Sequence, residues 1–102
     1  MGFNMKALQQ MQNRMMKMQE ELQNTTFTGT SGGGAVTIQM TGKYEVTGVS
    51  IDPEVVDPQD AGMLEDLILT AIQDAFSKVT DAQGKLMSSL TGGIKLPPGM
   101  GF

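Results

Sequence analysis

The stretch AVTIQMTGKYEVTGVSI, residues 35–51, decides the fold. In its first seven residues apolar and polar side chains alternate, which predicts a half-buried strand. The apolar face of this strand holds Val36, Ile38 and Met40. Gly42-Lys43 then predicts a turn, so the second half of the stretch is expected to run back as an antiparallel strand.

The returning strand, residues 44–51, changes its alternation part-way along. Its apolar residues fall on two faces, with Tyr44 and Val46 on one and Val49 and Ile51 on the other. Gly48 stands where the parity changes, and a glycine inside a strand is typical of a bulge. We therefore expect a bulge at Gly48.

Working toward the N-terminus, residues 25–31 predict a third strand, which Gly32-Gly33-Gly34 ends. Residues 4–24 consist largely of good helix formers and predict a helix. Steps of three and four separate its apolar residues, the spacing of a helix that lies along another helix. These seam residues are Leu8, Met11, Met15, Met18 and Leu22. The charged residues fall outside the seam, on a solvated face.

Toward the C-terminus, Asp52-Pro53 ends the sheet, and a second helix is expected to start near Asp57-Pro58 or Asp60. An apolar stripe then runs for about thirty residues at helical spacing. It consists of Leu64, Leu67, Ile68, Ala71, Ile72, Ala75, Phe76, Val79, Leu86 and Leu90. Gly92-Gly93 is expected to stop the helix, so that residues 1–93 form one domain and residues 94–102 an extended or flexible tail.

These elements predict an α+β fold of the order α-β-β-β-α, with a three-stranded antiparallel sheet and two long projecting helices. A strand of six residues spans about 20 Å, whereas helices of 20 and 30 residues span about 30 and 45 Å. Both helices should therefore overhang the sheet and leave apolar stripes uncovered, which predicts a homodimer with paired helical arms. The expected interface residues are Leu8, Met11, Met15, Met18, Leu22, Leu86 and Leu90.

The composition argues against an enzyme and against a metal or cofactor site. The chain has no Cys and no His, so the usual nucleophile and base pairs and zinc sites cannot be assembled. The glycine-rich stretch 29–34 leads into a strand rather than a helix, so we interpret it as a connection and not a phosphate loop. The ten Met residues admit Cu(I) binding or a peptide groove, but their match to the seam favours packing. We expect no small-molecule substrate. We also expect no membrane association, because no apolar stretch approaches the roughly 20 residues of a transmembrane span.

Charge is distributed unevenly along the chain. The net charge is −4, yet residues 1–18 carry three cations and no acid, while residues 44–81 carry nine acids against Lys78. Lys6, Arg14 and Lys17 could contact phosphates from an outer helix face. Charge alone favours ordinary solvated side chains over a polyanion site.

Four segments together resemble the YbaB/EbfC family of bacterial nucleoid-associated proteins. They are MQNRMMKMQEELQ in the first helix, TGTSGGGAVTIQMTGKYEVTGVSIDPEVV over the strands, MLEDLILTAIQDAFSKV in the second helix and the ending TGGIKLPPGMGF. The resemblance implies a homodimer whose paired helices project like tweezers and bind DNA with little sequence preference, in the cytoplasm at the nucleoid. The DNA-binding positions it implies are Lys6, Arg14, Lys17, Lys78, Lys85 and Lys95. Thr47-Gly48 departs from the family, many members of which carry an arginine pair there.

We therefore expect a DNA-binding homodimer without enzymatic activity. The alternative is a homodimeric protein-interaction module that grips a partner with its Met-rich arms. Met16, which lies off the seam, would be the residue to distinguish the two hypotheses.

Overall fold

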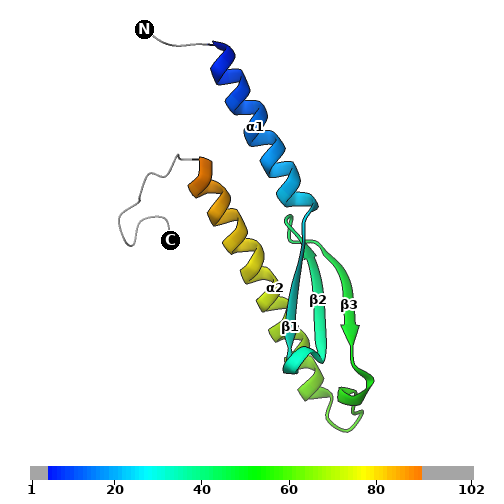
Figure 1. Ribbon diagram of the computed structural model, residues 1–102. Coiled ribbons are helices and arrows are strands. Elements are labelled where there is room, and N and C mark those ends of the chain that lie inside the picture. The colour runs from blue at the N-terminus through cyan, green and yellow to red at the C-terminus, as the bar shows by residue number, and fades with distance from the viewer. Residues whose placement is uncertain (1–4, 91–102) are drawn as a thin grey trace, which may run out of the picture.

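The computed structural model of the protein describes residues 5–90, in which two helices accompany one three-stranded sheet (Figure 1). In chain order these elements are α1 (Met5–Asn24), β1 (Thr26–Ser31), β2 (Val36–Thr41), β3 (Val46–Ile51) and α2 (Ala61–Leu90). The order confirms the predicted α-β-β-β-α architecture. The predicted tail and the helix stop at Gly92-Gly93 lie outside the described residues.

The sheet is antiparallel, with the strands in the order β1-β2-β3. The connection from β1 to β2 is a short 3-10 turn, Gly32–Gly34, in which φ is 60°, 69° and 96°. Positive φ suits glycine because it has no β-carbon. The predicted apolar face of β2 is confirmed, since its three residues are buried: Val36, Ile38 and Met40.

The predicted bulge in β3 is confirmed. Gly48 pairs with Gln39, but Met40 pairs with Val46, so Thr47 is an extra residue in β3. The prediction that β3 presents apolar residues on opposite faces is wrong. Because Thr47 is extra, Val46 pairs with Met40 and Val49 pairs with Ile38. Both valines therefore lie on the face of the sheet that carries the buried residues of β2.

The start of β3 also differs from the prediction, because Tyr44 precedes the strand. Its φ is 64°, a left-handed conformation that is uncommon for a residue with a side chain. The Tyr44 side chain is held by α2: its hydroxyl lies 2.9 Å from Thr80 Oγ1, and its ring lies 4.5 Å from that of Phe76, centroid to centroid. Residues 41–44 therefore form the turn between β2 and β3.

Helix α2 packs across β1 and β2, where Ala71, Ala75 and Val79 have no exposed surface. Small side chains on this side of α2 let its backbone approach β1 closely. At Gly29 the approach leaves no room for a β-carbon, which would overlap the carbonyl oxygen of Ala71 and the backbone nitrogen of Ala75. The core therefore depends on a glycine in β1 and alanines in α2.

The N-terminus of α2 is capped by Asp60. The Oδ1 atom of Asp60 accepts a hydrogen bond from the Met63 N–H at 3.3 Å, and the helix begins at Ala61. Of the two predicted starting points, the second is confirmed. Asp57 lies in the preceding turn, where its carbonyl accepts from the Asp60 N–H.

Both helices extend beyond the sheet, as predicted. Figure 1 shows the first half of α2 against the strands and its second half projecting beside α1, which meets the sheet only at its base. α1 contains no buried residue, and the described chain measures 71 Å by 29 Å by 15 Å. Within residues 5–90, the seam residues Leu8, Met11 and Met15 of α1 therefore remain exposed.

Candidate nucleic-acid interface

The three cations of α1 lie on one side of the helix. With about 100° of rotation per residue, they fall within an arc of about 80°. They are Lys6, Arg14 and Lys17, and all three are exposed. We call this set the basic face of α1. It is separate from the seam, so the seam can pack against another helix while the basic face stays in contact with solvent.

The molecule is polarised along its long axis. Residues 52–66 contain six acids and no Lys or Arg, and they occupy the end of the molecule opposite the free end of α1 (Figure 1). The acidic end repels a polyanion, whereas the basic face of α1 carries charge of the opposite sign. The net charge of −4 thus conceals a surface that can contact phosphates.

Of the other predicted DNA-binding residues, Lys85 is exposed on the projecting half of α2, whereas Lys78 contacts the sheet. Lys78 Nζ donates to the carbonyl of Thr28 at 2.7 Å and lies 3.3 Å from Asp74 Oδ2. The same carboxylate accepts from the Thr30 N–H at 2.9 Å. β1 is an edge strand, so this ion pair occupies backbone groups at the sheet edge. Lys95 lies outside the described residues.

The Thr30 N–H, together with Lys78, holds the pKa of Asp74 below its ordinary value of 3.8. The ionised carboxylate therefore stabilises the fold at neutral pH, and this contribution is lost as the pH falls through the lowered pKa. We expect Asp74→Asn to be less stable than the wild type at pH 7, with the difference shrinking below pH 3.8. Urea unfolding at several pH values measures the stability difference at pH 7 and its decrease at low pH.

Asp81→Asn is the matched control for this prediction, because Asp81 is an exposed carboxylate of the same helix. The unfolding free energy of Asp81→Asn should stay close to that of the wild type at pH 7. A stability difference for Asp74→Asn that does not depend on pH would contradict the assigned role of the carboxylate.

The seam of α1 is uncovered, which agrees with its predicted role at an interface between copies. The Leu8 side chain is 41% exposed and that of Met15 is 38% exposed, while Met18 and Leu22 near the base are half-buried. Met16 is 68% exposed and lies away from both the seam and the basic face. Met11, in the upper part of the seam, is 59% exposed.

A second uncovered apolar area was not predicted, and it lies on β3 and on the flank of α2 that holds Phe76. α2 covers β1 and β2, so the β3 part of the same sheet face remains exposed. Phe76 reaches this area beside Tyr44, and Leu69 lies seven residues earlier on the same flank of α2. We call it the β3–α2 apolar surface, formed by Val46, Val49, Leu69 and Phe76, each about half exposed. Assigning Val49 to the opposite face hid this area from the sequence analysis.

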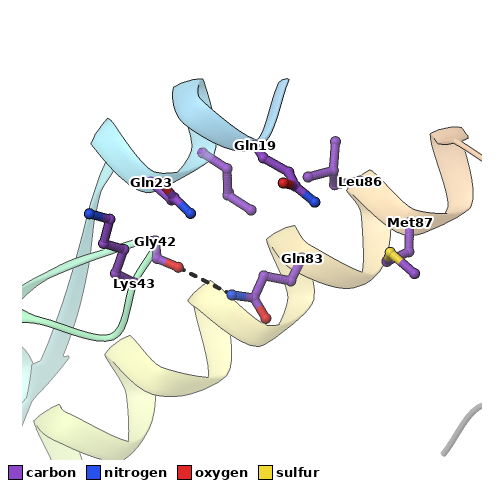
Figure 2. A pocket seen from close by; sticks show the side chains of 8 residues that line it. Gln19, Gln23, Gly42, Lys43, Gln83, Leu86 and Met87 are labelled. Atoms are coloured by element: carbon purple, nitrogen blue, oxygen red, sulfur yellow. Dashed lines mark hydrogen bonds between the residues drawn. The ribbon is translucent and has the colours of Figure 1, made fainter. Parts of the chain in front are cut away.

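A pocket of about 350 Å³ lies at the base of the arms, between the last turns of α1, the β2–β3 turn and α2 (Figure 2). Leu22 and Leu86, both predicted as interface residues, line it together. The remaining lining consists of three amide side chains, Gln19, Gln23 and Gln83, together with Gly42, Lys43 and Met87. Sequence reasoning treated Lys43 only as a turn residue, although it adds a cation beside the base of α1.

Two further observations concern the described part of the chain. Residues 5–90 contain no group of three or more His, Cys, Asp or Glu side chains placed to hold a metal ion. Neither of the helices in this part is long and apolar enough to cross a membrane.

Comparison with known proteins decides the family. The family model of the YbaB/EbfC DNA-binding family matches residues 1–94. The chain belongs to this family. The match confirms the resemblance inferred from the sequence segments.

Relatives named as nucleoid-associated proteins match most of the chain. One from Nitrobacter winogradskyi is 49% identical over 98 residues, which cover 96% of this chain and 92% of the relative. Another from Chloroflexus aurantiacus is 52% identical over 91 residues, which cover 89% of this chain and 91% of the relative. Among solved structures, an uncharacterised protein from Helicobacter pylori superposes with a TM-score of 0.73 at 21% identity, covering 89% of this chain and all of the other. This last likeness shows that the fold is shared.

Proposed function

We propose that the protein is a nucleoid-associated protein that binds duplex DNA as a homodimer, non-specifically or with weak sequence preference. The observation that carries this proposal is the basic face of α1: three exposed cations on a projecting helix, at the end of the molecule farthest from its acidic segment, in a chain of a DNA-binding family. Lys and Arg contacts to phosphates position a protein on DNA but carry no sequence information, which accounts for the weak preference.

The other proposed DNA contacts come from α2 and the chain end. Lys85 projects from the upper half of α2, and Lys95 follows beyond the described residues. Lys78 is a secondary contact, because its ammonium group already binds Thr28 and Asp74. A phosphate at Lys78 has to share the ammonium with these groups, so we expect the α1 cations to supply most of the binding.

Two uncovered apolar areas support the homodimer. One is the exposed part of the α1 seam, with Leu8, Met11 and Met15, and the other is the β3–α2 apolar surface. Leu86 and Leu90 of α2 are further proposed interface positions. Fully burying a large apolar side chain contributes about 1.5–3 kcal/mol, whereas association costs about 4–15 kcal/mol in lost freedom. Covering half-exposed residues in both copies can offset that cost. The dimer doubles the basic faces, so two arms can contact one duplex.

The nucleoid is the proposed location, as the names of the relatives indicate for those proteins. By occupying duplex DNA without a catalytic step, the dimer would affect nucleoid organisation and the expression of the covered genes. A protein of this kind needs no cofactor and no small-molecule substrate.

The proposal is tested by fluorescence anisotropy with a labelled duplex and with a duplex of scrambled sequence, from about 50 to 200 mM salt. We expect similar affinities for the two duplexes. If two arms contact about six phosphates, the affinity should fall on the order of a thousandfold across this range. Sedimentation of the same sample should give twice the chain mass of 10.9 kDa.

Two results would contradict the proposal. An absence of binding at the lowest salt concentration would remove the DNA-binding function. A stable particle of single-chain mass would remove the homodimer, and with it the doubling of the basic faces.

A further inference from the structure

We propose that Gly42 sets the angle between α1 and α2 of one chain and is thereby a positioning residue for DNA binding. This inference rests on the proposed function only for its effect on DNA. The effect on the angle follows from contacts at the base of the arms, where α1, the β2–β3 turn and α2 meet (Figure 2).

α1 is held to the rest of the chain near its last turns. Its half-buried residues, Met18 and Leu22, both lie there, and the helix ends in a cap at Thr25, whose N–H donates to the Leu22 carbonyl at 3.1 Å. Thr25 Oγ1 also donates to the carbonyl of Glu21 at 2.7 Å. The direction of the whole helix therefore depends on what this last turn rests against.

The last turn of α1 rests on Gly42, which is buried. A β-carbon at Gly42 would overlap the carbonyl of Leu22 and lie 3.1 Å from the Cα of Gln23. These neighbours are backbone atoms of the helix, which cannot rotate away as a side chain can. Gly42 is not among the glycines with positive φ, so the requirement for glycine here comes from the close approach of α1 and not from the turn conformation.

The same turn is fixed to α2 on its other side. Gln83 Nε2 donates to the Gly42 carbonyl at 3.1 Å, the hydrogen bond drawn in Figure 2. Gln83 Oε1 in turn accepts from the Tyr44 hydroxyl at 3.1 Å. Gly42 thus contacts α1 through its Cα and α2 through its carbonyl, and it fixes the position of one arm relative to the other.

A small displacement at this point is amplified along α1. Lys6 lies about 24 Å along the helix from Leu22, so a tilt that relieves an overlap at the base moves the basic face by a larger distance. Because phosphate positions on a duplex are fixed, arms held at a different angle can contact fewer of them at once. Substituting Gly42 should therefore weaken DNA binding while leaving the packing of α2 on the sheet in place.

The absence of cysteine from the chain allows a direct measurement of the angle. Nitroxide labels are placed at Gln12→Cys on α1 and Ser89→Cys on α2, and the distance between them is measured by pulsed electron paramagnetic resonance. Labelled chains are mixed with an excess of unlabelled chains, so that each labelled chain has an unlabelled partner. We expect Gly42→Ala to lengthen or broaden the distance distribution and to weaken DNA binding about tenfold.

Gly84→Ala is the matched control, since it makes the same substitution in the projecting half of α2 where a β-carbon meets nothing within 4 Å. It should change neither the distance nor the affinity. An unchanged distance in Gly42→Ala would overturn the inference, and so would a changed distance with wild-type affinity. If wild-type protein fails to bind DNA, the proposed function fails, and the distance still decides whether Gly42 sets the angle.

Gln83→Ala provides a second variant in case Gly42→Ala lowers the helical circular dichroism signal. It removes the hydrogen bond that holds the Gly42 carbonyl to α2, without adding volume at the turn. We expect a broader distance distribution and weaker DNA binding. A distribution identical to that of the wild type would overturn the inference.

Discussion

Replacing Gly29 with valine is expected to unfold the protein. A β-carbon at this position in β1 would overlap backbone atoms of Ala71 and Ala75, so α2 would have to move off the sheet as a unit. Ordinary overpacking costs about 1–3 kcal/mol, and a displaced helix also exposes the core side chains of β2. We expect a loss of about 4 kcal/mol or more, comparable with the whole stability of about 5–15 kcal/mol that is typical of a small domain.

Urea unfolding followed by circular dichroism measures this loss. Gly29→Ala should fall between the wild type and Gly29→Val, because its single methyl group already meets the α2 backbone. Gly84→Val adds the same side chain at an open helix position and should change the free energy of unfolding by less than about 1 kcal/mol. If Gly29→Val unfolds at the wild-type urea concentration, the close packing of β1 against α2 is not required for folding.

Reversing two charges on the basic face of α1 is expected to remove most DNA binding. In Arg14→Glu with Lys17→Glu, the proposed dimer would lose four phosphate contacts and gain four repulsive carboxylates. The slope of the logarithm of the affinity against the logarithm of the salt concentration should become shallower by about 0.9 for each lost contact. We expect at least a hundredfold weaker binding at low salt, measured by the anisotropy titration.

A charge-matched pair of variants separates the position of the charges from the net charge. Arg14→Gln with Lys17→Gln removes two cations from the basic face, whereas Gln59→Glu with Thr70→Glu adds two acids elsewhere, so both carry the same net charge. The first should bind DNA clearly more weakly than the second. Equal affinities would mean that net charge, and not the basic face of α1, governs binding.

Much of the fold could be predicted because its elements have strong local patterns. The alternation of Val36, Ile38 and Met40 identified the buried face of β2, and Gly48 marked the bulge. The direction of Val49 could not be predicted, since it depends on which residue of β2 each residue of β3 opposes after the bulge. Pairing of this kind is a property of the assembled sheet.

In the candidate site, too, features with a local pattern could be predicted, and contacts between distant residues could not. Exposed cations on α1 followed from their position outside the seam, and their exposure agrees with that expectation. The contact of Lys78 with Thr28 could not be anticipated, because it joins residues 50 positions apart in the chain. Gly42 was interpreted only as a turn residue, since nothing in a single sequence shows that another helix approaches its Cα.

Asp74 and Lys78 also have a consequence for the behaviour of the protein at high local concentration. Unpaired edge strands can template the addition of strands from other molecules and so promote fibrillar aggregation. Here the ion pair occupies backbone groups of Thr28 and Thr30, and the bulge at Thr47 interrupts the opposite edge. Molecules at high local concentration can therefore remain individually folded instead of merging into a continuous cross-β assembly.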